Sequence, residues 1–236
     1  MNNYEKLEGM VAATFTPLDE NGDVNLSVID KYADWIASTP IKGVFVCGTT
    51  GEFSSLTIDE RKLILEKWLV SARKRFKVIA HVGSNCQRSA MELARHAAQV
   101  GADAIASIAP SFFKPGTVDE LVDFFAPICH SAAGLPFYYY NMPSITGVNL
   151  PVDKFLVEGK KKIPNLVGTK FTHNNLMEMG VCIELEQHRF EVLHGYDEIL
   201  ISGLAMGAVA GVGSTYNYIP NVYQAIFDSM KMNDLE

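Results

Sequence analysis

The sequence Leu166-Val167-Gly168-Thr169-Lys170-Phe171 places a single lysine inside a short, largely apolar run. Such a run is typical of a buried parallel strand. Desolvation lowers the pKa of a buried amine, and a neutral amine is a nucleophile toward carbonyl groups. The stretch alone leaves two interpretations open: Lys170 is a reactive amine, or it lies at a strand end and simply reaches water.

Similar apolar runs recur along the chain about every 30 residues, which is the length of a strand-helix-strand unit. Eight strands are therefore predicted, over residues 9–16, 43–47, 77–82, 104–109, 136–141, 166–171, 191–194 and 208–213.

Helix signals lie between these runs. Thr57-Ile58-Asp59-Glu60 and Thr117-Val118-Asp119-Glu120 each have the pattern of a capping box. Gly101 is expected to end the helix that precedes it, and Pro151 suits the first turn of another. Pro127 predicts a kink or an early end of the second capped helix.

Alternating strands and helices imply a parallel sheet. Eight repeats favour an α/β fold of the closed (β/α)₈ TIM-barrel type, forming a single domain over residues 1–236. No G-x-G-x-x-G follows the first strand, which counts against a dinucleotide-binding sheet.

Composition narrows the class of protein further. The 236 residues are 48% hydrophobic with a net charge of -7 and no basic block, so nucleic acid is not an expected partner. Four scattered cysteines without a C-x-x-C pair indicate reduced thiols. The polar N-terminus and the lack of a long apolar run predict a cytoplasmic protein that does not bind membranes.

Functional residues of parallel barrels collect where the strands end. The second strand runs into Gly48-Thr49-Thr50-Gly51-Glu52, whose N–H groups and hydroxyls could cradle an anion or form an ordinary glycine-rich turn. The fifth contains Tyr138-Tyr139-Tyr140, with Tyr138 and Tyr140 on one face. Tyr140 and Lys170 are predicted to lie on neighbouring strands, where phenol and amine form a plausible proton-transfer pair.

The last two strands also end in polar residues. Asp197 and Glu198 could bind a polyol, or they could be acids favoured at a helix N-terminus. The stretch from Gly211 to Thr215 occupies the place of a phosphate site in many barrels. No histidines have metal-ligand spacing, and His81 and His194 are interpreted as structural, so no metal is predicted.

Several of these stretches together resemble the dihydrodipicolinate synthase family of class I aldolases. The resemblance runs in order from Leu7 to Asn217. It rests on Gly48-Thr49-Thr50-Gly51-Glu52, Tyr140-Asn141-Met142-Pro143 with Thr146-Gly147, Gly168-Thr169-Lys170, Gly195-Tyr196-Asp197-Glu198 and Gly213-Ser214-Thr215-Tyr216-Asn217.

The resemblance implies roles for these residues. Lys170 would form a Schiff base with pyruvate or with the ketone of a sialic acid, and Tyr140 would move the proton during carbon–carbon cleavage. Thr49 and Thr50 would hold the pyruvyl carboxylate. The residues implied on the sugar side are Thr172, Gly195, Asp197, Glu198 and Ser214. The protonated imine is the electron sink, so no cofactor is implied. A homotetramer is the assembly implied.

Two departures from the synthase branch favour a sugar acid as substrate. Ser144-Ile145-Thr146 lacks the arginine that binds a dicarboxylic substrate there, and Ser111-Phe112-Phe113 lacks the relay tyrosine. The predicted reaction is reversible cleavage of N-acetylneuraminate to N-acetylmannosamine and pyruvate. Another 2-keto-3-deoxy sugar acid stays open as the substrate. The chain also lacks the family's further C-terminal helices, which leaves a truncated isoform with little or no activity as an alternative.

Overall fold

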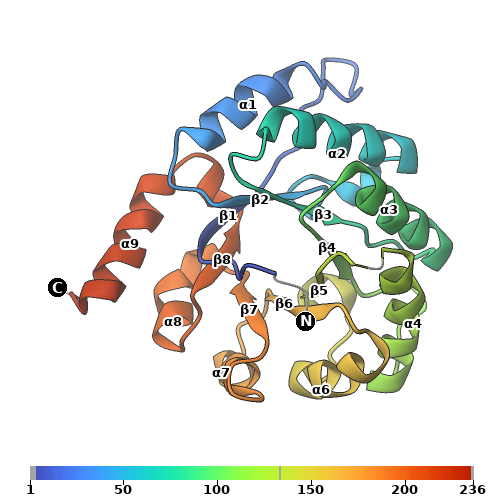
Figure 1. The fold of residues 1–236 in the computed structure, drawn as a ribbon, viewed down its shortest axis with the longest axis vertical. Coiled ribbons are helices and arrows are strands. Elements are labelled where there is room, and N and C mark those ends of the chain that lie inside the picture. The colour runs from blue at the N-terminus through green and yellow to red at the C-terminus, as the bar shows by residue number, and fades with distance from the viewer. Residues whose placement is uncertain (1–3, 133, 235–236) are drawn as a thin grey trace.

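Within residues 4–132 and 134–234, which the computed structural model describes, eight parallel strands close into a barrel (Figure 1). Each strand pairs with its sequence neighbours, and the last pairs back to the first. The strands are β1 (Gly9–Ala13), β2 (Gly43–Val46), β3 (Lys77–His81), β4 (Ala104–Ile108), β5 (Phe137–Asn141), β6 (Leu166–Phe171), β7 (Glu191–His194) and β8 (Ala210–Gly213). The predicted (β/α)₈ TIM barrel is confirmed.

All predicted strands are present, although several are shorter than predicted. The largest difference is at β1, which ends at Ala13 instead of residue 16. Beyond it the chain bends toward the next loop, and the Thr16 hydroxyl donates to the Gly51 carbonyl (2.7 Å). The second strand ends one residue early because Cys47 has a φ of 54°, which breaks the pleat.

Helices surround the strands as an outer ring (Figure 1). They are α1 (Val28–Ala37), α2 (Ile58–Ala72), α3 (Gln87–Val100), α4 (Val118–Ser131), α5 (Pro143–Thr146), α6 (Val152–Lys162), α7 (Leu176–Glu184), α8 (Leu200–Ala205) and α9 (Pro220–Met232). None of the helices in the described part of the chain is both long enough and apolar enough to cross a bilayer.

The helix signals in the sequence are largely confirmed. The Thr57 hydroxyl and the Glu60 carboxylate form a complete capping box at the start of α2. At α4, Thr117 accepts from the Glu120 N–H, but the Glu120 carboxylate bonds to the Gly116 N–H, so only half of the box forms. The early end predicted at Pro127 is wrong, because α4 continues to Ser131 with buried residues on both sides of the proline.

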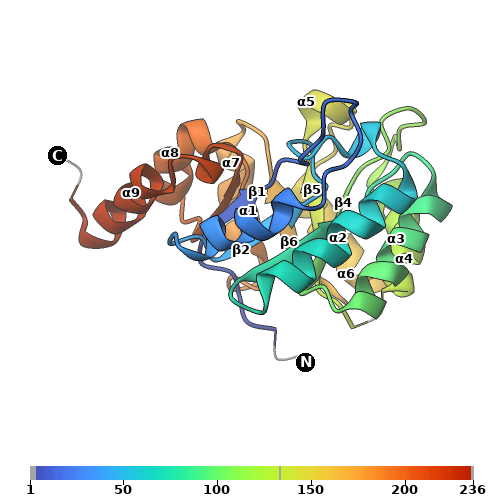
Figure 2. The same ribbon diagram turned by 90° about the horizontal axis from the view of Figure 1, so that it is seen from above.

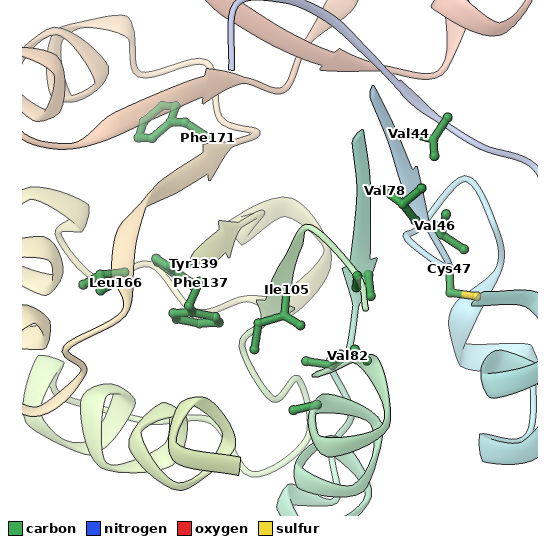
Figure 3. Packing of buried hydrophobic residues seen from close by; sticks show 14 of the residues in the cluster. Val44, Val46, Cys47, Val78, Val82, Ile105, Phe137, Tyr139, Leu166 and Phe171 are labelled. Carbon is green, nitrogen blue, oxygen red and sulfur yellow. The ribbon is translucent and has the colours of Figure 1, made fainter. Parts of the chain in front are cut away.

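Two buried layers make up the core. An outer layer lies between strands and helices and includes Val44, Phe137 and Tyr139 (Figure 3). An inner layer fills the barrel and includes Tyr138 and Tyr140. The predicted alternation along β5 is therefore confirmed, since Tyr139 faces the helices while its two neighbours face the barrel axis.

The two ends of the barrel are built differently. The chain enters at the end where the strands begin, and α5 lies at the opposite end (Figure 2). Leu7, on the entering segment, is buried in the inner layer, so this segment closes the end where the strands begin. We call this the lower end, and the opposite end the upper end. The upper end holds the strand termini where the functional residues were predicted.

Candidate active site

Lys170 is buried at the upper end of the barrel with only 4% of its surface exposed. Its Nζ lies 4.3 Å from the centroid of the Phe45 ring and 4.0 Å from that of Tyr140. It forms no hydrogen bond or ion pair to any described residue. An amine between two aromatic faces is held by cation–π attraction but keeps its nitrogen available. The burial of its side chain favours the interpretation of Lys170 as a reactive amine.

Tyr140 lies directly beside Lys170, as predicted. The two residues are paired across β5 and β6. The Tyr140 Oη lies 3.1 Å from Thr49 Oγ1 and 3.1 Å from the sulfur of Met142. The phenol therefore connects the lysine to the loop that follows β2.

That loop, from Cys47 to Glu52, has an uncommon backbone. Cys47 and Glu52 both adopt left-handed conformations, with φ of 54° and 56°, although neither is a glycine. They bracket Gly48 to Gly51 and turn the chain sharply across the barrel mouth. Thr49 and Thr50 are both half-buried on this turn. Left-handed non-glycine residues cost free energy and tend to persist at functional sites.

Thr172 and Gly195 lie together on the opposite side of the mouth. Thr172 is buried, and its hydroxyl has no hydrogen-bond partner within the described residues. A Cβ at Gly195 would overlap that hydroxyl, so only glycine fits there. A buried hydroxyl without a partner is costly unless something binds it. This geometry suits contact with a polar ligand.

Asp197 and Glu198 occupy different environments although they are adjacent. Asp197 is buried, and its Oδ2 accepts from the Thr215 N–H (2.7 Å) and hydroxyl (2.6 Å). This carboxylate thus fixes the loop after β8, which begins at Ser214. Glu198 is exposed at the start of a short 3₁₀ turn.

The two strand-end histidines contact protein groups in the described geometry, and their interpretation as structural stays a prediction. The His194 Nδ1 lies 3.4 Å from the sulfur of Met179, and desolvation lowers the pKa of this histidine. Burial lowers the pKa of His81 well below its usual 6.5, and the charges of Arg61 and Lys170 add to the effect. No cluster of three potential metal ligands occurs among the described residues.

Three residues near the lysine were not predicted from sequence. Phe45 contacts Lys170, and the sulfur of Met142 contacts the Tyr140 hydroxyl. The alternation of β2 could have placed Phe45 inside the barrel, but nothing in the sequence indicated the sulfur contact. Arg61 is buried, with 4% exposed, and reaches the end of β3 from α2. A charged residue at a buried helical position was the available signal.

A closed eight-stranded barrel with a buried, unpaired lysine beside a strand-end phenol defines the class of Schiff-base aldolases. Comparison with known proteins places the chain more closely. It belongs to the dihydrodipicolinate synthetase family, whose model matches residues 6–236.

Individual relatives agree with the family match. The chain is 43% identical over 234 residues to "N-acetylneuraminate lyase" of Mus musculus, covering 98% of this chain and 73% of the relative. It is similar to the structure of Proteus mirabilis N-acetylneuraminate lyase, with a TM-score of 0.95 and 37% identity over 98% of this chain and 78% of the other. A "Ruminococcus gnavus sialic acid aldolase catalytic lysine mutant" gives a TM-score of 0.94 at 28% identity, covering all of this chain and 76% of the other.

Proposed function

We propose that this chain cleaves N-acetylneuraminate reversibly to N-acetylmannosamine and pyruvate, with Lys170 as the Schiff-base lysine. The observation that carries the proposal is the buried Lys170 amine, 4.0 Å from the Tyr140 ring and without an acceptor among the described residues. The relatives named N-acetylneuraminate lyase support the substrate. The catalytic lysine named for the Ruminococcus gnavus structure supports the type of chemistry.

The reaction begins with addition of the Lys170 amine to the ketone of the open-chain sugar acid. Loss of water gives a protonated imine, which is an electron sink. The aromatic faces of Phe45 and Tyr140 suit this step, because they stabilise a cation without accepting its proton.

Cleavage then needs a group that moves the proton of the hydroxyl next to the breaking bond. That proton leaves through Tyr140 Oη, the bonding electrons move onto the imine nitrogen, and the hydroxyl becomes the aldehyde of N-acetylmannosamine. Protonation of the resulting enamine and addition of water release pyruvate and restore the amine. The 3.1 Å contact with Thr49 holds Tyr140 Oη at the mouth, in support of this role.

The two ends of the substrate would be bound on opposite sides of the mouth. Thr49 and Thr50 would hold the carboxylate on their left-handed turn. Thr172, Gly195, Asp197, Glu198 and Ser214 would line the sugar side. The partnerless hydroxyl of Thr172 and the close approach at Gly195 support this division.

A sugar acid is preferred over a dicarboxylic substrate because the turn after β5 carries no cation. Its residues are Ser144 and Ile145, both exposed, and the buried Thr146. None of these three residues offers a second carboxylate a counter-charge of its own, although the Lys114 ammonium lies beside Gly147 at the end of the turn. Hydroxyl groups can be bound without one.

Assembly and location are part of the same proposal. The side chains of Phe112 and Phe113, in the loop after β4, are 76% and 87% exposed, which supports association with further copies. The homotetramer itself is proposed from the family resemblance. All four cysteines are free, in support of a reducing, cytoplasmic location.

Purified protein incubated with N-acetylneuraminate tests the function. Pyruvate and N-acetylmannosamine should appear in equal amounts, and the reverse reaction should consume both. A panel of shorter 2-keto-3-deoxy sugar acids is the comparison. Faster cleavage of one of them would replace the substrate, and release of pyruvate from none would refute the proposal.

A further inference from the structure

The loop from Cys47 to Glu52, which carries Thr49, begins at a residue that is hydrogen-bonded to His81. The Cys47 carbonyl lies 2.8 Å from His81 Nδ1, and the Ile108 N–H lies 3.3 Å from His81 Nε2. A carbonyl can only accept and an N–H can only donate, so the hydrogen must be on Nδ1. His81 is therefore a neutral bridge that joins the ends of β2, β3 and β4.

Arg61 in turn holds the strand end that carries this histidine. Its Nη1 donates to the Gly83 carbonyl (2.9 Å) and its Nη2 to the His81 carbonyl (2.7 Å). Its guanidinium lies 5.4 Å from the centroid of the Phe53 ring. A buried arginine whose two Nη groups donate to two carbonyls of one loop fixes that loop in both position and orientation.

The same histidine also contacts the phenol. The His81 ring meets the Tyr140 ring edge-to-face at 5.8 Å, and Phe53 packs on the other side of His81 at 4.6 Å. One imidazole thus touches Cys47, the first residue of the loop that carries Thr49, and the ring of Tyr140. A shift of His81 would move the Cys47 backbone or the Tyr140 ring, and with them the Thr49 Oγ1 and Tyr140 Oη atoms, which lie 3.1 Å apart.

We propose that Arg61 and His81 are positioning residues that set the geometry of Thr49 and Tyr140 without touching the substrate. Arg61 fixes His81, and His81 holds the strained Cys47 backbone and the Tyr140 ring. This inference rests on the proposed aldolase function, although its structural part can be measured without turnover. The alternative is that both residues only stabilise the fold.

The kinetic test uses paired variants on the full chain. Arg61→Met removes both donated hydrogen bonds at similar length, and His81→Leu removes the bridge. Each should lower kcat by about 10²-fold, the usual effect of displacing a catalytic group by about 1 Å. Rates are expressed per site that pyruvate and borohydride can trap, so that unfolded molecules do not count.

Conservative variants should rescue part of the loss. In His81→Asn the amide nitrogen can still donate to the Cys47 carbonyl, so kcat should recover most of the way. Arg61→Lys should be intermediate, because an ammonium cannot match both carbonyls in one plane. Arg75→Met is the matched control: Arg75 also donates to two carbonyls, Ser71 and Ala72, but from the far end of α2. It should leave kcat unchanged.

A thiol readout tests the positioning role without any substrate. Cys86 is exposed while Cys47, Cys129 and Cys182 are buried, so labelling is done in a Cys86→Ser background with a maleimide and peptide mapping. Loosening of the loop should raise labelling at Cys47 alone in Arg61→Met and His81→Leu. A parallel rise at all three cysteines would indicate global destabilisation and would overturn the proposal.

The outcomes separate this inference from the proposed function. Wild-type kcat per trapped site in Arg61→Met and His81→Leu would overturn the positioning role while leaving the aldolase intact. If Arg61→Met does not fold, Arg61→Lys and the two His81 variants carry the same comparison. Failure of the wild type to trap pyruvate would refute the proposed function, and selective labelling of Cys47 would still decide whether Arg61 and His81 hold the loop.

Discussion

Tyr138 and Tyr140 lie two residues apart on the same inward face of β5, yet their hydroxyls meet opposite surroundings. Tyr138, at the lower end, donates to Glu191 Oε2 (2.9 Å) and is hydrogen-bonded to Tyr4, while the Leu7 N–H donates to Glu191 Oε1 (2.7 Å). Every polar group in this chain of contacts has a partner. Tyr140, at the upper end, lies beside an amine that has none among the described residues.

The difference indicates that the lower end of the barrel contributes mainly to stability, while the upper end carries the groups proposed to react. The lower end uses a tyrosine to satisfy a buried carboxylate and to anchor the entering chain segment. The upper end leaves the buried Thr172 hydroxyl without a partner among the described residues, which costs stability, and it holds the Lys170 amine between two aromatic rings. Substitutions at the two ends should therefore separate activity from stability.

The largest effect is expected from Lys170→Ala, which removes the amine proposed to attack the ketone. Cleavage of N-acetylneuraminate should fall to the uncatalysed level, since no other described strand-end lysine lies between aromatic faces. The rate of pyruvate release measures this. Lys77→Ala is the control at the lower end, where Lys77 pairs with Asp103 (3.4 Å), and it should keep its activity.

Tyr140→Phe should lower kcat by about 10²–10⁴-fold, the usual contribution of a positioned acid–base group. Pyruvate binding should largely remain, because the phenyl ring still packs over Lys170 and the carboxylate contacts lie at Thr49 and Thr50. Steady-state kinetics and borohydride trapping measure the two parts. A variant that turned over at nearly the wild-type rate would reduce Tyr140 to a packing residue.

Tyr138→Phe should show the reverse behaviour. Removing this hydroxyl leaves Glu191 and Tyr4 without their shared partner, so the free energy of unfolding should fall by about 1–3 kcal/mol. The kcat per trapped site should stay at the wild-type value. Urea denaturation and kinetics on the same preparation measure both, and a lowered kcat at unchanged stability would contradict the division between the two ends.

The smallest effect is a pH dependence at the lower end. Burial raises the pKa of Glu191 above its ordinary 4.5, although the hydrogen bonds from Leu7 and Tyr138 oppose the shift. The folded state then binds more protons than the unfolded state above about pH 4.5, so Glu191 makes stability fall as pH rises and stops doing so above its folded pKa.

Glu191→Gln removes this titration. The free energy of unfolding of the wild type, relative to the variant, should therefore decline from pH 4.5 upward and then level off. Glu8→Gln, an exposed acid on the same segment, is the control. A difference between wild type and Glu191→Gln that rises with pH would mean that Glu191 is stabilised in its charged form.

Much of the fold was predictable because local patterns and the global architecture agree. Buried strands of Val, Ile and Ala at a regular spacing specify a closed parallel barrel. The nearness of Tyr140 to Lys170 followed from pairing of consecutive strands, but their exact register depends on a shift between Phe137 and Tyr138 that the sequence did not predict. Of the kink or early end predicted at Pro127, the early end did not occur, because burial of Ile128 and Cys129 outweighed the bond that Pro127 cannot donate.

The environment of the site was harder to predict, because it depends on contacts between residues far apart in the sequence. Nothing local indicates that Arg61 donates to the end of β3, or that the Asp197 carboxylate is used by Thr215. Motif resemblance proposed the site residues, while only the three-dimensional structure shows which of the described hydroxyls have hydrogen-bond partners.

The most direct test of the Lys170 assignment is borohydride trapping of pyruvate on the wild-type protein, followed by intact-mass analysis and peptide mapping. The account predicts one reduced pyruvyl group per chain, located on Lys170 and absent from Lys170→Ala. An unmodified protein, or an adduct on any other lysine, would contradict it.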